Sequence, residues 1–202
     1  GISLYKINVG DEEVIRLDIL IGGGQHSQDK TLQSMFTNRM LREGSLGRSS
    51  QQIAEKLDFY GAWLDLSSSV NYNFVTLYSL NKYFDQTLDV LSGIVKQPTF
   101  PENEFATVVD NNRQQYLVNC ERVDMMTRKR LNESLFGKSH PLGKYAYLDD
   151  YSNINIEDLK EFYRKNYHSG NITIFVSGKV TDDIVAKIGK AFGDEQWGEV
   201  KA

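Results

Sequence analysis

The sequence has very little cysteine and histidine, and each shortage excludes a class of site. Cys120 is the only cysteine among 202 residues, so no intrachain disulfide can form and zinc sites built from paired cysteines are excluded. A single thiol fits a reducing compartment. The three histidines are His26, His140 and His168, and no two of them have the H-x-x-x-H spacing that places both on one helical face.

Long apolar runs and a leader segment are also missing. No apolar stretch reaches the roughly 20 residues that a membrane helix needs, and no basic stretch followed by an apolar one predicts a signal peptide. We therefore expect no membrane span, and these absences alone favour a cytoplasmic location. The chain begins at Gly1 instead of Met, which indicates that a segment before it has been removed.

The sequence has no basic excess. Lys and Arg number 23 against 27 Asp and Glu, which gives a net charge of −4. Nucleic-acid surfaces usually have the opposite balance, so no nucleic-acid partner is expected. The local basic cluster within residues 122–130 is interpreted as a solvated helix face.

Motifs for nucleotide binding or nucleophilic catalysis are not found. Gly22-Gly23-Gly24 is not followed by Lys and Ser or Thr in phosphate-binding spacing, so a turn at a strand end is favoured. Cys120 has no sequence sign of a histidine partner and is interpreted as an inert thiol. Exposed or capping roles are expected for His140 and His168.

Apolar periodicity predicts the secondary structure. Alternation predicts strands over residues 3–9, 14–21, 62–70, 74–80 and 172–178. Helical spacing predicts helices over about 32–41, 50–60, 84–96, 101–119, 123–136, 155–167 and 181–192. Turns are expected to join the first two strands as one pair and the next two as a hairpin. The second helix is expected to be capped by Ser49 or Ser50, and the last by Thr181.

Strands paired as hairpins, with helices in blocks, are typical of the α+β class. We therefore predict a mainly antiparallel sheet with helices packed on one face. One domain over residues 1–192 is expected, followed by a polar linker or tail over residues 193–202.

Several segments, in order along the chain, resemble one half of a pitrilysin/insulinase-family metallopeptidase, an inverzincin. They are IAEKLDFYGA at residues 53–62, HPLG at 140–143, the helix end at 159–171 with its Phe-Tyr and Asn-Tyr pairs, and the strand at 171–180. The resemblance spans Gly1 to Phe192. It implies two such halves facing each other like a clamshell, in one chain or as two subunits, with peptide bound as an added strand on a sheet edge.

The zinc motif of that family, H-x-x-E-H, is replaced in this chain. The segment Met40 to Ser45, MLREGS, resembles the end of the motif region and fixes the register. The motif positions are then Met35 to Arg39, and the distal glutamate position falls near Asn111-Asn112.

The residues at these positions are unsuited to a hydrolytic zinc site. The thioether of Met35 is a poor ligand for such a zinc, and the permanent positive charge of Arg39 repels a cation. Asn38 has no pKa useful to a general base, and Asn112 lacks a carboxylate. We therefore predict no catalytic residue, no metal and no cofactor for this chain, with Met35, Asn38, Arg39 and Asn112 as degenerate motif positions.

Two interpretations of Arg39 and Asn38 stay open. In the first, they bind a peptide carboxylate or carbonyl. In the second, which is favoured, they fill the former metal site and hydrogen-bond their neighbours.

The resemblance implies a non-catalytic peptidase-like domain that serves as the structural or peptide-binding half of a clamshell. Its partner would be a second similar half, in the same gene product or as a partner subunit, with a homo-oligomer and an extended peptide as further candidates. The alternative is a subunit of a zinc metallopeptidase whose H-x-x-E-H site lies on the other half. A third hypothesis is an assembly protein similar to the inactive core subunits of respiratory complexes.

Overall fold

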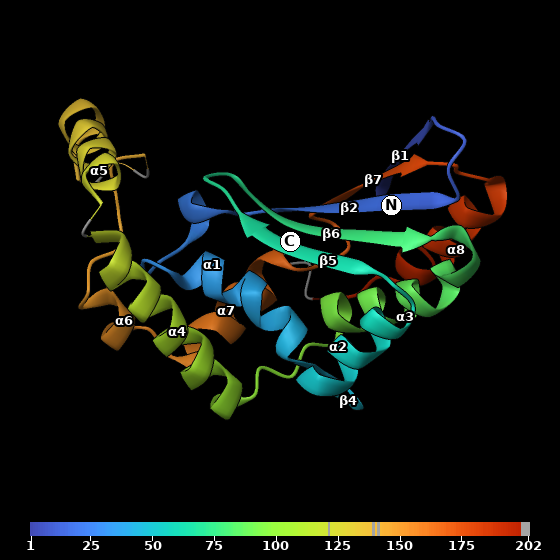
Figure 1. The fold of residues 1–202 in the computed structure, drawn as a ribbon, viewed down its shortest axis with the longest axis horizontal. Coiled ribbons are helices and arrows are strands. Elements are labelled where there is room, and N and C mark those ends of the chain that lie inside the picture. The colour runs from blue at the N-terminus through green and yellow to red at the C-terminus, as the bar shows by residue number, and fades with distance from the viewer. Residues whose placement is uncertain (121, 139, 141, 199–202) are drawn as a thin grey trace.

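The computed structural model describes residues 1–120, 122–138, 140 and 142–198. Its centre is a five-stranded sheet in the order β1-β7-β2-β6-β5 (Figure 1). The strands are β1 (Ser3–Asn8), β7 (Ile172–Gly178), β2 (Val14–Gly22), β6 (Tyr72–Leu80) and β5 (Trp63–Ser68). Only β1 and β7 pair in parallel, so the predicted α+β class with a mainly antiparallel sheet is confirmed.

The prediction that the first two strands pair with each other is wrong. β7 lies between them, with Ser3 opposite Thr173 in the parallel pair and Ile15 opposite Gly178 in the antiparallel one. The alternation of each strand specifies which side chains face the core, but not which strand lies beside it. The second predicted hairpin is confirmed, because β5 and β6 pair antiparallel with Trp63 opposite Tyr78.

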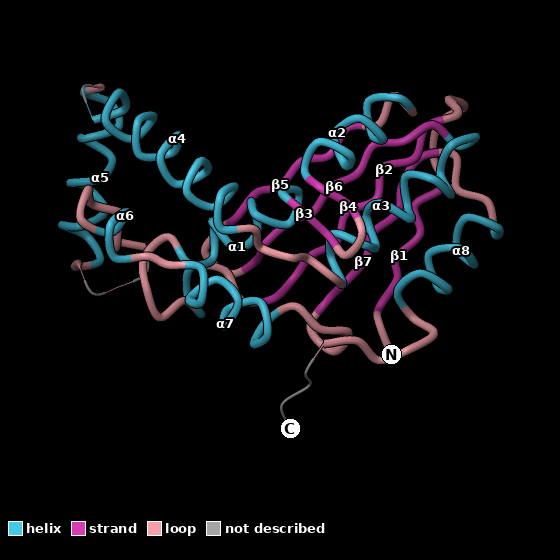
Figure 2. The backbone as a smooth tube through the Cα atoms, turned by 90° about the horizontal axis from the view of Figure 1, so that it is seen from below, coloured by secondary structure: helices cyan, strands magenta, loops and turns pink. Residues whose placement is uncertain are grey.

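One face of this sheet is covered by helices, and the described residues form eight α-helices in all. They are α1 (Gln33–Met40), α2 (Ser50–Phe59), α3 (Phe84–Lys96), α4 (Glu102–Cys120), α5 (Val123–Phe136), α6 (Asp150–Asn153), α7 (Ile156–Asn166) and α8 (Asp182–Phe192). In Figure 2, α4 and α5 lean away from the sheet, at the opposite end of the molecule from α8. A short pair, β3 (Gly44–Ser45) and β4 (Arg48–Ser49), precedes α2.

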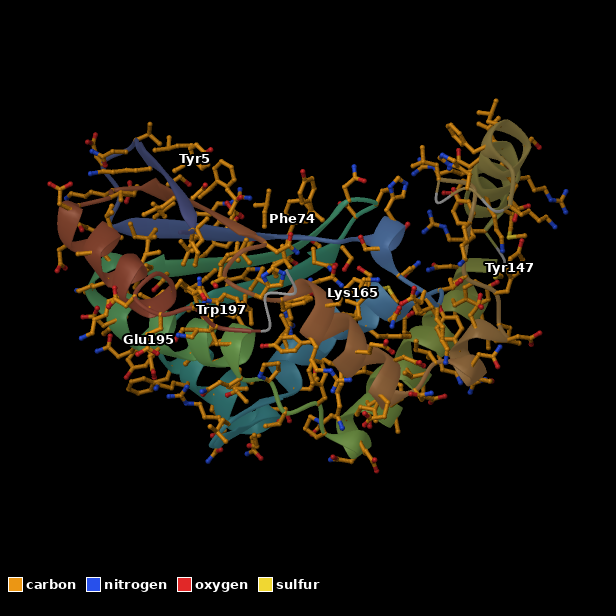
Figure 3. All side chains as sticks on the ribbon, turned by 180° about the vertical axis from the view of Figure 1, so that it is seen from behind. Tyr5, Phe74, Tyr147, Lys165, Glu195 and Trp197 are labelled. Carbon is orange, nitrogen blue, oxygen red and sulfur yellow. The ribbon has the colours of Figure 1, made fainter. Side chains whose placement is uncertain are left out.

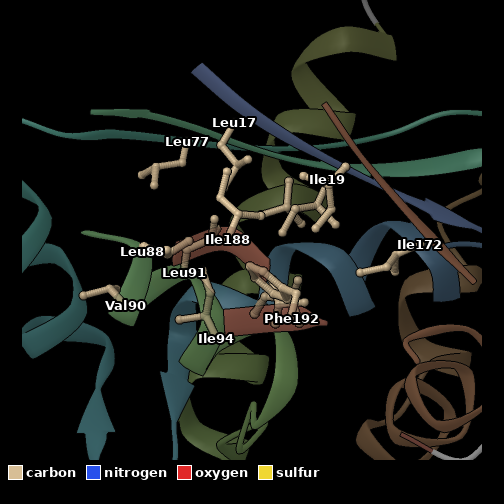
Figure 4. Packing of buried hydrophobic residues seen from close by; sticks show 14 of the residues in the cluster. Leu17, Ile19, Leu77, Leu88, Val90, Leu91, Ile94, Ile172, Ile188 and Phe192 are labelled. Carbon is tan, nitrogen blue, oxygen red and sulfur yellow. The ribbon is translucent and has the colours of Figure 1, made fainter. Parts of the chain in front are cut away.

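The main core lies between the sheet and the helices α3 and α8. Inward side chains of β2, such as Leu17 and Ile19, are fully buried against residues such as Leu91 and Ile188 (Figure 4). A second cluster joins α1 to α7 and α4, with Phe36 at its centre. Burial on one face only is the usual state of an antiparallel sheet with helices on one side.

The other face of the sheet is open. Tyr5 and Phe74 point away from the helix layer, whereas Trp197 lies on the helix side (Figure 3). Trp63 and Tyr78 are also exposed on the open face, where they lie opposite each other. This face therefore carries aromatic rings without a covering layer among the described residues.

Helix ends follow the capping chemistry of the sequence. Ser49 caps α2 in a capping box with Gln52, and the Thr181 side chain accepts a hydrogen bond from the Ile184 backbone at 3.3 Å. Of the two serines left open, Ser49 is therefore the cap.

The segment after Phe192 returns to the core. Trp197 is only 8% exposed, and its ring nitrogen donates to the Phe192 carbonyl at 3.2 Å. Within residues 193–198, expected as the start of a linker or tail, Trp197 thus packs against the domain while its neighbours in that range are exposed, and residues 199–202 lie outside the described part. None of the helices in the described ranges combines the length and apolar composition of a membrane span.

Candidate functional site

Helix α1 carries the degenerate motif positions between the sheet and α7. It contacts α7, β5, β6 and α4. Asn38 is fully buried, Met35 is half-buried in the second cluster, and Arg39 is exposed. Within one turn of α1, Asn38 thus lies in the interior of the fold, whereas Arg39 faces a pocket.

Asn38 uses its side chain to hold α1 to the sheet. Its Nδ2 donates to the carbonyls of Ser67 at 2.8 Å and Phe74 at 3.0 Å. Its Oδ1 accepts a hydrogen bond from the Tyr167 hydroxyl at 3.0 Å. Both amide hydrogens therefore have a partner inside the fold, so we exclude the interpretation that Asn38 binds a peptide.

Burial holds Tyr167 in its neutral form. Burial, with Tyr163 nearby, raises the pKa of Tyr167 well above its ordinary value. The hydroxyl therefore stays a hydrogen-bond donor to Asn38 at neutral pH. This network occupies the position where the family places its general base.

A pocket of about 470 Å³ opens on the exposed side of α1, between α4 and the edge strand β5. Its polar lining consists chiefly of Arg39, Arg42, Asp65, Asn111, Asn112 and Gln115. The pocket brings together Arg39 and the distal Asn111-Asn112 pair, as the register predicts. Met35 faces instead a neighbouring pocket of about 340 Å³, which Asn112 also lines.

Two side chains of this pocket differ in how they are held. A hydrogen bond fixes the carboxamide of Asn112, whereas no described residue bonds to the guanidinium of Arg39. The Tyr151 hydroxyl donates to Asn112 Oδ1 at 3.0 Å. Arg39 has no hydrogen bond or ion pair within the described part of the chain, although its charge lowers the pKa of Tyr151 against the larger effect of burial. The favoured interpretation, that Arg39 hydrogen-bonds its neighbours, is therefore not found here.

These residues do not fit zinc. A hydrolytic zinc takes imidazole, carboxylate or thiolate ligands, whereas the chain offers a thioether, carboxamides and a guanidinium. Among the residues that the structure describes, no three His, Cys, Asp or Glu side chains lie close enough to hold a metal ion. We therefore derive no catalytic step through a metal here.

The remaining sequence candidates lie elsewhere. The ring of His140 stacks on Phe136, with centroids 5.4 Å apart, and its Nδ1 accepts from the Leu142 backbone. Pro141 of the HPLG segment lies outside the described residues. Cys120 is half-buried, and burial, together with the nearby Cys120, raises the pKa of Tyr116.

The motif positions do not include three other residues that line this pocket, Arg42, Glu43 and Asp65. Arg42 Nη2 donates to the Leu64 carbonyl on β5 at 2.8 Å. Burial and the nearby Glu104 charge raise the pKa of Glu43, which also lines the pocket. Asp65 lines the pocket because β5 is an edge strand of the sheet and contacts α1, and the β5–β6 hairpin predicted from the sequence does not specify either of these.

Comparisons with known proteins agree with this picture. A family model described as Insulinase (Peptidase family M16) matches residues 9–143, and one described as Peptidase M16 inactive domain matches residues 153–201. An uncharacterized zinc protease of Rickettsia felis is 25% identical, over 96% of this chain and 48% of the relative. Cytochrome b-c1 complex subunit 2 of Yarrowia lipolytica is 21% identical, over 94% of this chain and 45% of the relative.

A solved structure shows the same fold. The crystal structure of a peptidase M16 inactive domain from Pseudomonas fluorescens superimposes with a TM-score of 0.88 at 21% identity, over 100% of this chain and 50% of that chain. The chain thus spans about half the length of the curated relatives and of the solved structure that it matches.

Proposed function

Because this chain belongs to the insulinase family, peptidase family M16, we propose that it is a non-catalytic half that binds peptide or supports a partner half. The observation that carries this proposal is the state of Asn38. At the family's general-base position, its carboxamide is buried and bonded to two sheet carbonyls and Tyr167. A side chain so held cannot take a proton from water.

The edge strand β5 supports a peptide-binding role. Among the described strands it pairs only with β6, so its other side is available to an added strand. An extended peptide gains main-chain hydrogen bonds by adding to such an edge. The pocket beside β5 would then receive side chains or an end of that peptide.

Chain length and the open sheet face support a partner half. The relatives are about twice as long as this chain, and one of them is named as a subunit of a complex. Exposed aromatic rings on the open face, such as Tyr5, Trp63 and Tyr78, are of the kind that interfaces cover. The second half would lie in the same polypeptide or in a partner subunit.

The alternative is a subunit of a zinc peptidase whose H-x-x-E-H site lies on the other half. The Rickettsia felis relative, named a zinc protease, favours this alternative. Both proposals make this chain metal-free and differ only in what the other half carries.

A single preparation tests both proposals. The full-length protein would be purified with its native partners, the partners identified by mass spectrometry, and zinc counted per complex. We expect the zinc count to equal the number of H-x-x-E-H motifs present, with none assigned to this chain. A partner carrying that motif selects the alternative. Stoichiometric zinc with chelator-sensitive peptide cleavage, in a preparation that contains no H-x-x-E-H motif, would contradict both.

A further inference from the structure

Arg39 presents an unengaged guanidinium to the pocket beside β5. It stands in the last turn of α1 and is exposed, and no described residue bonds to it. A guanidinium in this state is a ready partner for a carboxylate, because its planar donors match two carboxylate oxygens.

Further donors face the same pocket. The Asn112 carboxamide receives the Tyr151 hydroxyl on its oxygen, so its Nδ2 group is left to donate elsewhere. Asn111 is exposed beside it, and Arg42 supplies a second guanidinium. The lining of the pocket therefore includes several hydrogen-bond donors.

Arg42 also limits how far a strand can pair along β5. Its Nη2 occupies the carbonyl of Leu64, near the start of β5. A strand added to β5 would meet the Arg42 guanidinium at that carbonyl, so we expect its pairing to end there. In an antiparallel pair, the C-terminus of the added strand lies at the N-terminal end of β5, and this is the end where Arg42 blocks the edge.

We propose that this pocket binds the C-terminal carboxylate of an extended peptide that pairs antiparallel with β5, with Arg39 as the principal ligand. Arg42 both ends the pairing and adds a second positive charge, and Asn112 donates from α4. The inference rests on the proposed function, because it assigns a ligand end to the same peptide-binding edge.

Two acidic side chains of the pocket lining bear on this site. Glu43 also lines the adjoining pocket between α2 and β5, and burial and Glu104 raise its pKa. Asp65 is exposed on β5 and is the carboxylate that competes with a peptide for Arg39. Removing the Asp65 charge should therefore strengthen carboxylate binding.

The test uses the full-length protein and two probes. They are an N-terminally labelled octapeptide of alternating Thr and Val with a free C-terminal carboxylate, and the same peptide as its C-terminal amide. Fluorescence anisotropy at pH 7 gives each Kd. We expect the acid to bind at least about tenfold tighter than the amide, as one charge-assisted pair provides.

The variants separate a binding role from a structural one. R39Q should raise the Kd of the acid most of the way to that of the amide, because Arg39 is the principal ligand, and should leave the Kd of the amide unchanged. R164Q, an exposed arginine on α7, should change neither, and D65N should tighten the acid alone. If R39Q weakens binding of the acid and the amide by the same factor, the proposal is overturned, because the substitution then acts on the structure and not on the carboxylate.

The remaining outcomes distinguish this inference from the proposed function. If acid and amide bind equally well, the carboxylate pocket is wrong while a peptide-binding role stands. If neither peptide binds, the peptide-binding role and the pocket fail together.

Discussion

At the scale of single residues, Asn38 shows why a carboxamide stands where the family places a glutamate. Two backbone carbonyls, of Ser67 and Phe74, face its Nδ2 group. A carboxylate there would place negative charge against two acceptors in a fully buried site. The amide is thus required by the way in which α1 meets the sheet.

Replacing Asn38 by aspartate should therefore destabilise the fold. The change keeps the shape but removes both donors and buries an unpaired charge, so we expect a loss of roughly 2–4 kcal/mol in unfolding free energy. Urea denaturation followed by circular dichroism measures the loss. Asn103→Asp is the matched control, because Asn103 is exposed in the first turn of α4 and should change stability by less than about 1 kcal/mol. Equal losses of unfolding free energy in both variants would show that the hydrogen bonds of Asn38 do not stabilise the packing of α1 on the sheet.

Part of the site could be predicted from sequence, because a motif has a fixed spacing. The register assigns Arg39 and Asn112 to motif positions that are far apart in the sequence, and the two residues line one pocket. Tyr167 and Tyr151 could not be placed in this way, because their contacts with Asn38 and Asn112 come from segments far along the chain. Only the packing of α1 against α7 and α4 brings them together.

At the scale of elements, helix α2 depends on the residue that caps its N-terminus. Ser49 accepts from the Gln52 backbone while the Gln52 side chain accepts from the Ser49 backbone, so two free helix donors are satisfied. Ser50 instead donates to Glu104 on α4 at 2.9 Å. The two adjacent serines therefore have different roles.

Ser49→Ala should cost about 1 kcal/mol of unfolding free energy, because alanine cannot cap a helix. Ser49→Gly is the matched comparison, since glycine is tolerated at this position and should cost only a few tenths of a kcal/mol. Thermal unfolding of the two variants measures the difference. If the glycine variant loses as much as the alanine variant, the cap contributes nothing to the fold.

The order of the strands in the sheet could not be predicted from the sequence. Local alternation predicts β1 and β2 correctly as strands, and the short connection between them suggests a pair. The sheet instead places β7, from near the C-terminus, between them. Such a parallel partner has no local signal, because its pairing depends on a strand about 170 residues away along the chain.

At the scale of the whole molecule, the two faces of the sheet differ in coverage. Helices cover one face, and no described element covers the other. The helix side is closed by α3, α8 and Trp197, while the opposite side shows Tyr5, Trp63 and Tyr78 to solvent. Tyr5 stacks on Phe175, with ring centroids 5.0 Å apart, and Arg16 lies over the Tyr78 ring. An ordered aromatic surface of this kind suits contact with a second half.

The two tryptophans test whether a second half covers this face. Trp63 is 67% exposed and Trp197 only 8% exposed in this chain. Hydroxyl-radical footprinting read by mass spectrometry would compare the 202-residue chain alone with the assembly that it forms with the proposed second half. We expect Trp63 oxidation to fall several-fold in the assembly, because the partner half excludes solvent from the open face, while Trp197 oxidation stays low in both samples. Trp197 is the internal control, since a rise in its oxidation in the shorter chain would report loss of the fold. Equal oxidation of Trp63 in both samples, with Trp197 protected in both, would mean that the partner half docks elsewhere and leaves the open face in contact with water.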